Sequence, residues 1–173
     1  MNISSKLLTG VVAAVAALSA ATASAQVPSV AAGEIVIGKL HAEGAQIYEC
    51  KPDSKKSPSA EQVLTWQFVE PVATLFVDGK PVGRHGAGPN WDHIDGSGVK
   101  GRVIASASGA TAKDIAWLRL EVTDRRGKGM LSDATAVLRL DTKGGLAQGS
   151  CARAGEQLSV GYAADYVFLR KGE

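Results

Sequence analysis

The chain has 173 residues, of which 45% are hydrophobic and 21% are charged, with a formal net charge of +2. Basic and acidic side chains are nearly balanced, and no clustered basic face is evident, so we expect no nucleic-acid partner and no binding to an anionic membrane surface. This length and hydrophobic content suit one domain with its own core.

The first 25 residues have the pattern of a cleavable export signal. Lys6 precedes the apolar stretch 11–18, and small residues continue to Ala25. The stretch is shorter than the roughly twenty apolar residues that a membrane-spanning helix needs. The sequence therefore predicts a signal peptide at residues 1–25 and a mature domain at residues 26–173, exported to the periplasm or outside the cell. No later run is apolar enough to predict a membrane span after cleavage.

The chain has two cysteines, Cys50 and Cys151. In an oxidising compartment they would form one disulfide, and closing a loop of about 100 residues would stabilise the fold by about 4–5 kcal/mol. A catalytic thiol is the alternative, but Cys50 has no acid–base pattern around it. We predict a disulfide that ties an early strand to the segment before the last strand.

Twenty glycines, spread along the chain, separate short apolar runs, which is typical of a β protein. Strands are expected, in chain order, at Glu34–Leu40, Ala45–Cys50, Val63–Val69, Ala73–Val77, Val99–Ala107, Trp117–Asp124, Thr135–Asp141 and Asp165–Arg170. The pattern predicts an all-β single domain, a sandwich or barrel of about eight strands with long glycine-rich loops and one disulfide.

The segments between these strands are expected to be turns and loops. The first two strands flank a turn at His41–Gly44, where His41 is interpreted as structural, and Asp78–Pro81 is a strong turn signal. Lys51–Ser59 is expected to be an exposed loop. Weak helical patterns occur only at Ser57–Leu64 and Thr111–Ile115.

Two of the predicted strands have an aliphatic face and a mixed face. The mixed faces carry Trp117, Arg119 and Glu121 in one strand and Val137, Arg139 and Asp141 in the other. A tryptophan on a charged face could be a platform for a ligand. We favour the alternative that Trp117 lies under neighbouring arginine stems or under a covering loop.

The segment Asp78–Val99 is the most unusual part of the sequence, and its glycine content predicts a loop rather than a strand. It contains the candidate ligand-binding residues His85, Asn90, Trp91, Asp92, His93 and Asp95. Trp91 could stack on a polar ligand. Alternatively, His85, His93 and one of the two aspartates could bind a metal, or Trp91 could simply plug the end of the core. The seven-residue spacing of the histidines is no recognised metal signature, so we assign no metal and no cofactor.

Recognised catalytic motifs are absent from the sequence. It contains no G-x-S-x-G elbow, no H-E-x-x-H pair, no C-x-x-C pair and no phosphate-binding P-loop. A triad could be assembled from Ser97, His85 and Asp95, but with many serines available this choice carries little information. We therefore assign no catalytic residue.

An ordered series of short motifs resembles a known family of exported proteins. The motifs are Gln46–Cys50, Trp66–Phe68, Val82–Trp91, Asp95–Ser97, Ala116–Leu118, Arg139–Gly145 and Tyr162–Phe168. Together they resemble the family catalogued as domain of unknown function 3455, over about residues 45–168. The chain departs from that pattern at Gly86, where an aromatic residue is more common, and at Ala116, where proline is common. The resemblance implies an exported single domain with paired cysteines and implies no activity.

Three hypotheses about function follow. The preferred one is a non-enzymatic extracytoplasmic module that binds a small molecule or an envelope component through the segment His85–Asp95. The second is a metal-dependent hydrolase that uses His85 and His93. The third is a structural or protein-interaction component of the envelope, with the Trp117 face or a sheet edge as its contact surface.

Overall fold

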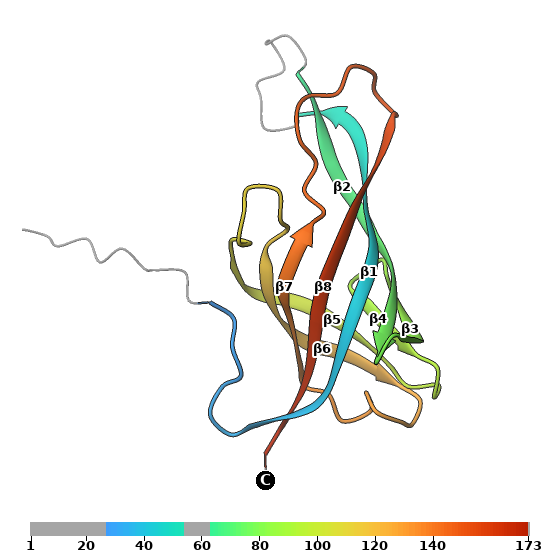
Figure 1. Ribbon diagram of the computed structural model, residues 1–173, viewed down its shortest axis with the longest axis vertical. Coiled ribbons are helices and arrows are strands. Elements are labelled where there is room, and N and C mark those ends of the chain that lie inside the picture. Colours follow the sequence, from blue (N-terminus) through green and yellow to red (C-terminus); the bar gives the residue numbers. More distant parts are fainter. Residues whose placement is uncertain (1–26, 54–62, 173) are drawn as a thin grey trace, which may run out of the picture.

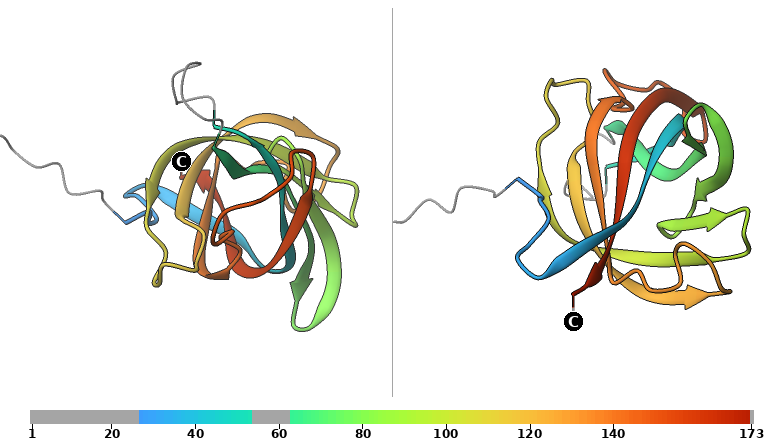
Figure 2. Two further views of the ribbon diagram at one scale, coloured as in Figure 1. Left: turned by 90° about the horizontal axis from the view of Figure 1, so that it is seen from above. Right: turned by 60° about the horizontal axis from the view of Figure 1, so that its bottom comes forward.

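The computed structural model describes residues 27–53 and 63–172, and this part of the chain contains strands and no helix. The strands are β1 (Glu34–Pro52), β2 (Leu64–Val77), β3 (Lys80–Gly86), β4 (Asn90–His93), β5 (Gly98–Ala107), β6 (Trp117–Arg126), β7 (Ala136–Gly144) and β8 (Gln157–Lys171). Each strand pairs antiparallel with the next, and β1 also pairs with β8, so the sheet closes into a barrel (Figures 1 and 2). The predicted all-β class is confirmed, with a barrel rather than a sandwich.

Some predictions concern residues outside the described part. They are the signal peptide, the start of the mature chain at Gln26 and most of the expected loop and weak helix within residues 51–64. Within the described residues, no helix is long and apolar enough to cross a membrane.

The turn expected at His41–Gly44 is wrong, because β1 continues through it as a single strand of 19 residues. A Cβ atom at Gly44 would lie 2.1 Å from the carbonyl oxygen of Val72 on β2. Glycine is therefore required here because the backbones of β1 and β2 approach closely, and not because the chain turns.

The strands expected on either side of Pro71 are likewise one strand, β2. Pro71 lies opposite Gln46, next to a register shift in the pairing of β1 with β2. On its other side, β2 pairs with β3 only over Ala73–Val77. Pro71 is therefore at a position where β2 has a single neighbour, and its missing N–H does not interrupt a second ladder.

The expectation that Asp78–Val99 is a loop is also wrong, since it forms the β3–β4 hairpin and the start of β5. The turn predicted at its start is confirmed: Asp78 and Gly79 have φ values of 48° and 73°, which suits a tight hairpin. A Cβ atom at Gly83 would lie 2.2 Å from the carbonyl oxygen of Asp92. As in β1, the glycine permits close strand pairing.

The weak helix considered at Thr111–Ile115 is a turn in the structure. The Asp114 carboxylate accepts hydrogen bonds from the backbone N–H of Thr111 at 2.9 Å and from its hydroxyl at 2.8 Å. The same carboxylate accepts a hydrogen bond from the backbone N–H of Gly144, at the end of β7. This turn is therefore fixed to the barrel by side-chain hydrogen bonds rather than by a helical period.

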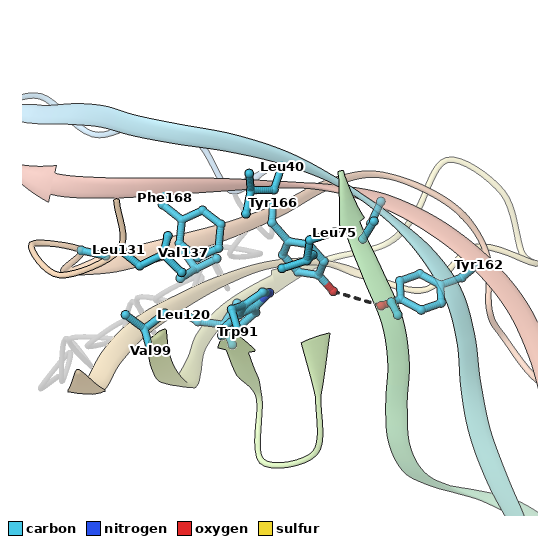
Figure 3. Packing of buried hydrophobic residues seen from close by; sticks show 14 of the residues in the cluster. Leu40, Leu75, Trp91, Val99, Leu120, Leu131, Val137, Tyr162, Tyr166 and Phe168 are labelled. Atoms are coloured by element: carbon cyan, nitrogen blue, oxygen red, sulfur yellow. Dashed lines mark hydrogen bonds between the residues drawn. The ribbon is translucent and has the colours of Figure 1, made fainter. Parts of the chain in front are cut away.

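The main core fills the inside of the barrel with side chains from every strand (Figure 3). Its largest fully buried members are Trp91, Tyr166, Phe168, Leu40, Leu75, Leu120, Leu131, Val99 and Val137. A smaller cluster of Ala136, Leu138, Val167 and Leu169, with Leu140 packed against it, lies on the other face of β7 and β8. The mixed face of β7, with Val137 and Arg139, is thus the one that faces the barrel interior.

The predicted disulfide is present. Cys50, near the end of β1, is bonded to Cys151, in the segment before β8, with the two Cα atoms 5.8 Å apart. The bond joins positions 101 residues apart in the sequence. It ties the extended ends of β1 and β2 to the chain that enters β8 (Figure 1).

Candidate functional site

All eight strands contribute side chains to a cavity of about 340 Å³ on the inner side of the sheet. The lining is Gln46, Tyr48, Phe68, Val69, Pro71, His85, Gly88, Pro89, Trp91, Val103, Ile115, Ala116, Leu118, Leu120, Arg139, Leu146 and Tyr166. Most of these residues are aliphatic or aromatic, and none is an aspartate or a glutamate. The cavity is therefore mainly apolar, with a few polar groups and one permanent charge.

The strands are short on one side of the barrel that encloses this cavity. β3 and β4 have 7 and 4 residues, whereas β1, β2 and β8 have 19, 14 and 15. Beyond the short hairpin, β2 pairs only with β1 and β5 pairs only with β6. The lining side chains next to this gap are exposed: Phe68 by 52%, Val69 by 46% and Val103 by 44%. The cavity thus has an apolar rim that water reaches.

The deep part of the cavity contains a stack of aromatic rings. His85 on β3 and Trp91 on β4 lie opposite each other in the strand register, and their rings are parallel, with centroids 4.7 Å apart. Tyr166 on β8 packs against both rings, at 4.9 Å from His85 and 5.3 Å from Trp91. The indole N–H of Trp91 is buried without a hydrogen-bond partner in the described residues. These three rings form a rigid apolar wall.

The hydrogen bond of His85 fixes which of its nitrogens carries the proton. Its Nδ1 lies 2.9 Å from the backbone carbonyl oxygen of Asn90, which can only accept, so Nδ1 donates. The pKa of His85 is lowered to about 4, mainly by burial; the hydrogen bond to Asn90 raises this pKa, and the positive charge of Arg139 lowers it. His85 is therefore neutral near pH 7, with Nε2 as a hydrogen-bond acceptor.

Arg139 carries the only permanent charge that the described part of the chain contributes to the cavity lining. It is half-buried, and its Nε–H donates to the carbonyl oxygen of Ala116 at 2.9 Å. In the strand register it lies opposite Tyr166 on β8 and Leu118 on β6. Among the described residues, no carboxylate lies within ion-pair distance of this guanidinium.

Two tyrosines and a glutamine complete the polar groups of this region. The hydroxyl groups of Tyr162 and Tyr166 lie 3.5 Å apart, and burial raises the pKa of both (Figure 3). Gln46 lies beside them with only 3% of its surface exposed, and its side-chain amide lies against the hydroxyl of Tyr162, whose pKa it lowers against the larger effect of burial. These three side chains form a buried polar group in an otherwise mainly apolar wall.

The structure divides the candidate residues predicted from the sequence. His85 and Trp91 line the cavity, and Asn90 supports His85 through its backbone carbonyl. Asp92 does not line the cavity and forms an ion pair with Arg126 of β6.

The other two candidates, His93 and Asp95, lie near the β4–β5 turn, with Nδ1 of His93 at 2.9 Å from a carboxylate oxygen of Asp95. Asp95 also accepts hydrogen bonds from the backbone N–H and the hydroxyl of Ser97, at 2.8 and 2.6 Å, and from the backbone N–H of Met130. Burial alone would raise the pKa of Asp95, but these hydrogen bonds outweigh it and hold that pKa well below its usual range. Neither residue is part of the cavity lining.

The described residues offer no support for a metal site or a nucleophilic triad around His85. No group of three or more His, Cys, Asp or Glu side chains in this part of the chain is placed to hold a metal ion. Ser97 and Asp95 are hydrogen-bonded to each other, but the Nδ1–H of His85 donates to Asn90 instead.

Sequence reasoning did not select Arg139, Gln46 or Tyr166 as site residues, although all three line the cavity. The alternation Val137-Leu138-Arg139 gave both faces of β7 aliphatic members, so only pairing with β6 and β8 determines which face is inside. Trp117, considered as a ligand platform, is half-buried and does not line the cavity.

No curated protein and no solved structure matches the chain. One family profile, described as "Protein of unknown function (DUF3455)", matches residues 31–170, which include all eight strands from β1 to the penultimate residue of β8. The profile covers most of the chain, and the chain therefore belongs to the DUF3455 family of proteins of unknown function.

Proposed function

We propose that this protein is a non-enzymatic extracytoplasmic module that binds a small, mainly apolar molecule in the barrel cavity. The observation that carries this proposal is the cavity of about 340 Å³, lined by all eight strands and open through an apolar rim. Small-molecule sites typically have volumes of about 300–1,000 Å³, mostly apolar walls and a few placed polar groups. The exposed rim residue Phe68 would give an apolar ligand a continuous path to the interior.

The polar groups of the cavity favour binding over catalysis. The buried His85 ring is held by a hydrogen bond and two aromatic contacts. The raised pKa values of Tyr162 and Tyr166 keep both phenols protonated near pH 7. These features support a rigid, preorganised site, and with a pKa of about 4 the free Nε2 of His85 is only a weak proton acceptor.

The proposed location rests on the sequence and on the disulfide. The N-terminal residues 1–25 have the pattern of an export signal, and a Cys50–Cys151 bond suits an oxidising compartment. Cleavage after Ala25 is checked by mass spectrometry of the protein recovered from the periplasm or the medium. Recovery of the uncleaved chain from the cytoplasm would contradict this part of the proposal.

The binding proposal is tested by titrating the oxidised protein with the neutral dye N-phenyl-1-naphthylamine, whose fluorescence rises in an apolar site. Two variants on β5 provide a matched comparison. Val103→Trp places an indole at the cavity rim, whereas Ile104→Trp adds the same bulk at the next, similarly exposed residue, which does not line the cavity. We expect Val103→Trp to weaken dye binding at least tenfold and Ile104→Trp to leave it unchanged.

Equal dye affinity in all three proteins would place the dye outside the cavity and contradict the proposal. Absence of dye binding to the wild-type protein, with a cooperative thermal transition as proof of folding, would also contradict it.

A further inference from the structure

We propose that the ligand of this cavity carries a carboxylate, which Arg139 binds inside the barrel while the apolar body of the ligand extends toward the rim. This inference rests on the proposed binding function and specifies the class of ligand: a small amphipathic acid. The observation behind it is a half-buried guanidinium with no acidic partner among the described residues, in the wall of a mainly apolar cavity.

The first argument is charge balance. Arg119, which is half-buried like Arg139, forms an ion pair with Glu34, and the exposed Arg102 and Arg126 also pair with carboxylates. Arg139, which is withdrawn into the barrel, forms none among the described residues, and no acidic residue lines its cavity. A cation removed from bulk water is destabilising unless a counter-charge accompanies it, so an anion from outside would complete this site.

The second argument is geometry. The Nε–H of Arg139 is occupied by the carbonyl oxygen of Ala116, which orients the planar guanidinium through a neutral backbone group. The terminal nitrogens are the part that a carboxylate engages with two parallel hydrogen bonds. Tyr166, opposite Arg139 in the strand register, accepts a hydrogen bond from the guanidinium through its hydroxyl oxygen and so also helps to orient it.

The third argument is the supply of further hydrogen-bond donors. The indole N–H of Trp91 is buried and unpaired in the described residues, and Trp91 lines the cavity together with Gln46, whose side-chain amide lies against the Tyr162 hydroxyl. A carboxylate has two oxygens with several acceptor positions, and these donors are neutral or positive, as an anion requires. Burial raises the pKa values of Tyr48, Tyr162 and Tyr166, and the positive charge of Arg139 acts against this effect. The same charge adds to the effect of burial in lowering the pKa of His85, so Arg139 makes the electrostatic potential in the cavity more positive.

The strand order separates the charged and the apolar parts of the site. Arg139 lies on β7, whereas the exposed rim residues Phe68 and Val69 lie on β2, with β8 and β1 between these strands in the ring. A ligand that places its head group at Arg139 therefore has apolar lining for its body, and its far end reaches the rim. This orientation buries the charge and leaves the apolar end nearest the solvent.

The test uses ligands that share a ten-carbon chain and differ in the head group: decanoate, decanol, decylamine and decyl phosphate. Each displaces N-phenyl-1-naphthylamine from the oxidised protein at a concentration below that at which it forms micelles. We expect decanoate to bind at least tenfold more tightly than decanol, and decylamine to bind most weakly. Decyl phosphate separates a carboxylate site from a general anion site, since tighter binding of the phosphate would overturn the carboxylate assignment.

Variants then assign the preference to Arg139. Arg139→Gln should abolish the difference between decanoate and decanol, with both affinities measured against the dye affinity of the same variant. Arg139→Lys keeps the charge without the planar pair of donors and should retain part of the preference. Arg102→Gln, which removes an equal charge from the exposed outer side of β5, is the control and should behave as the wild-type protein.

The outcomes separate this inference from the proposed function. Dye and decanol binding in the cavity with no preference for decanoate would overturn the carboxylate inference and leave the binding function standing. A preference for decanoate that survives in Arg139→Gln would also overturn it. Failure of the dye and of all four decyl compounds to bind would contradict both proposals. If Arg139→Gln does not fold, the comparison of decanoate with decanol on the wild-type protein still decides the inference.

Discussion

His85 and Trp91 face each other across the β3–β4 pair with their rings parallel, at a centroid distance of 4.7 Å and an interplanar angle of 11°. Both rings are almost completely buried, with 4% and 1% of their surfaces exposed. A neutral imidazole suits this position, whereas a protonated one would place an unpaired charge in the core near Arg139. The stack therefore makes stability depend on pH.

We predict that the free energy of unfolding falls as the pH is lowered from about 6.5 to about 4. The pKa of His85 is about 4 in the folded protein, below its ordinary value near 6.5, so in this window the unfolded chain takes up a proton that the folded chain does not. The full effect is on the order of 3 kcal/mol. Urea unfolding at several pH values measures it.

The control for the pH prediction is His85→Phe, which keeps an aromatic ring against Trp91 and removes the titrating group. Its stability should change much less with pH over the same window, even if it is lower at pH 7 because the hydrogen bond to Asn90 is lost. An equal pH dependence in both proteins would show that His85 is not the responsible group.

A second prediction concerns two glycines that the sequence alone does not distinguish. Gly44→Ala should destabilise the protein by about 3 kcal/mol or more, because the new Cβ would lie 2.1 Å from the Val72 carbonyl oxygen and backbone atoms would have to move. Gly86→Ala should change stability by less than about 0.5 kcal/mol, since no atom lies within 4 Å of its Cβ position. Urea unfolding of both variants makes the comparison. Equal effects would contradict the close approach of β1 and β2.

These glycines also show why the strands were only partly predictable. Alternation predicted six of the eight structural strands, whereas β3 and β4 lie in the segment that was expected to be a loop. The continuity of β1 through Gly44 and of β2 through Pro71 did not follow. Glycine and proline usually interrupt a strand. Only the long-range pairing shows that Gly44 lets β1 and β2 approach closely and that Pro71 lies where β2 pairs with one neighbouring strand.

The candidate site was predictable to a similar extent. The unusual composition around His85 and Trp91 singled out six candidate residues, of which these two line the cavity. Arg139 could not be selected, because its strand is aliphatic on both faces and the cavity requires residues from eight strands. Whether a residue faces the cavity depends on barrel closure, which is a property of long-range pairing rather than of local sequence.

A third prediction separates Asp95 from the binding site. Its carboxylate accepts hydrogen bonds from Ser97 and from Met130, and the Ser97 hydroxyl in turn accepts one from the backbone N–H of the fully buried Leu131. Asp95→Ala should therefore cost about 2 kcal/mol of stability. Dye affinity should be unchanged under conditions where the variant is folded. Loss of dye binding at unchanged stability would place Asp95 in the site after all.

The contribution of Asp95 to stability also falls as the pH is lowered, but it does so in a lower pH range than the contribution of His85. The pKa of Asp95 is held below its usual range, so its stabilisation is complete above pH 4 to 5 and is lost as the pH falls further and the carboxylate is protonated. The two groups can therefore be told apart in one series of unfolding measurements. His85→Phe should flatten the upper window, and Asp95→Ala should flatten the lower one.

A fourth prediction concerns the disulfide. Replacing both Cys50 and Cys151 by serine should lower the free energy of unfolding by about 4–5 kcal/mol, because the bond closes a loop of 101 residues and restricts the unfolded chain. Urea unfolding of the variant and of the wild-type protein measures the difference. Reducing agent should destabilise the wild-type protein by a similar amount and leave the variant unaffected.

Dye binding to the folded serine variant shows whether the disulfide also affects the shape of the cavity, in addition to restricting the unfolded chain. Tyr48, two residues before Cys50 on β1, lines the cavity and donates a hydrogen bond from its hydroxyl to the carbonyl oxygen of Gly145. This bond and the pairing of β1 with β2 and β8 hold β1 in place without the disulfide. Dye affinity of the folded serine variant should therefore stay within about threefold of the wild-type value, a change of about 0.7 kcal/mol. A much larger loss, with the fold intact by circular dichroism, would mean that the disulfide shapes the cavity as well as stabilising the barrel.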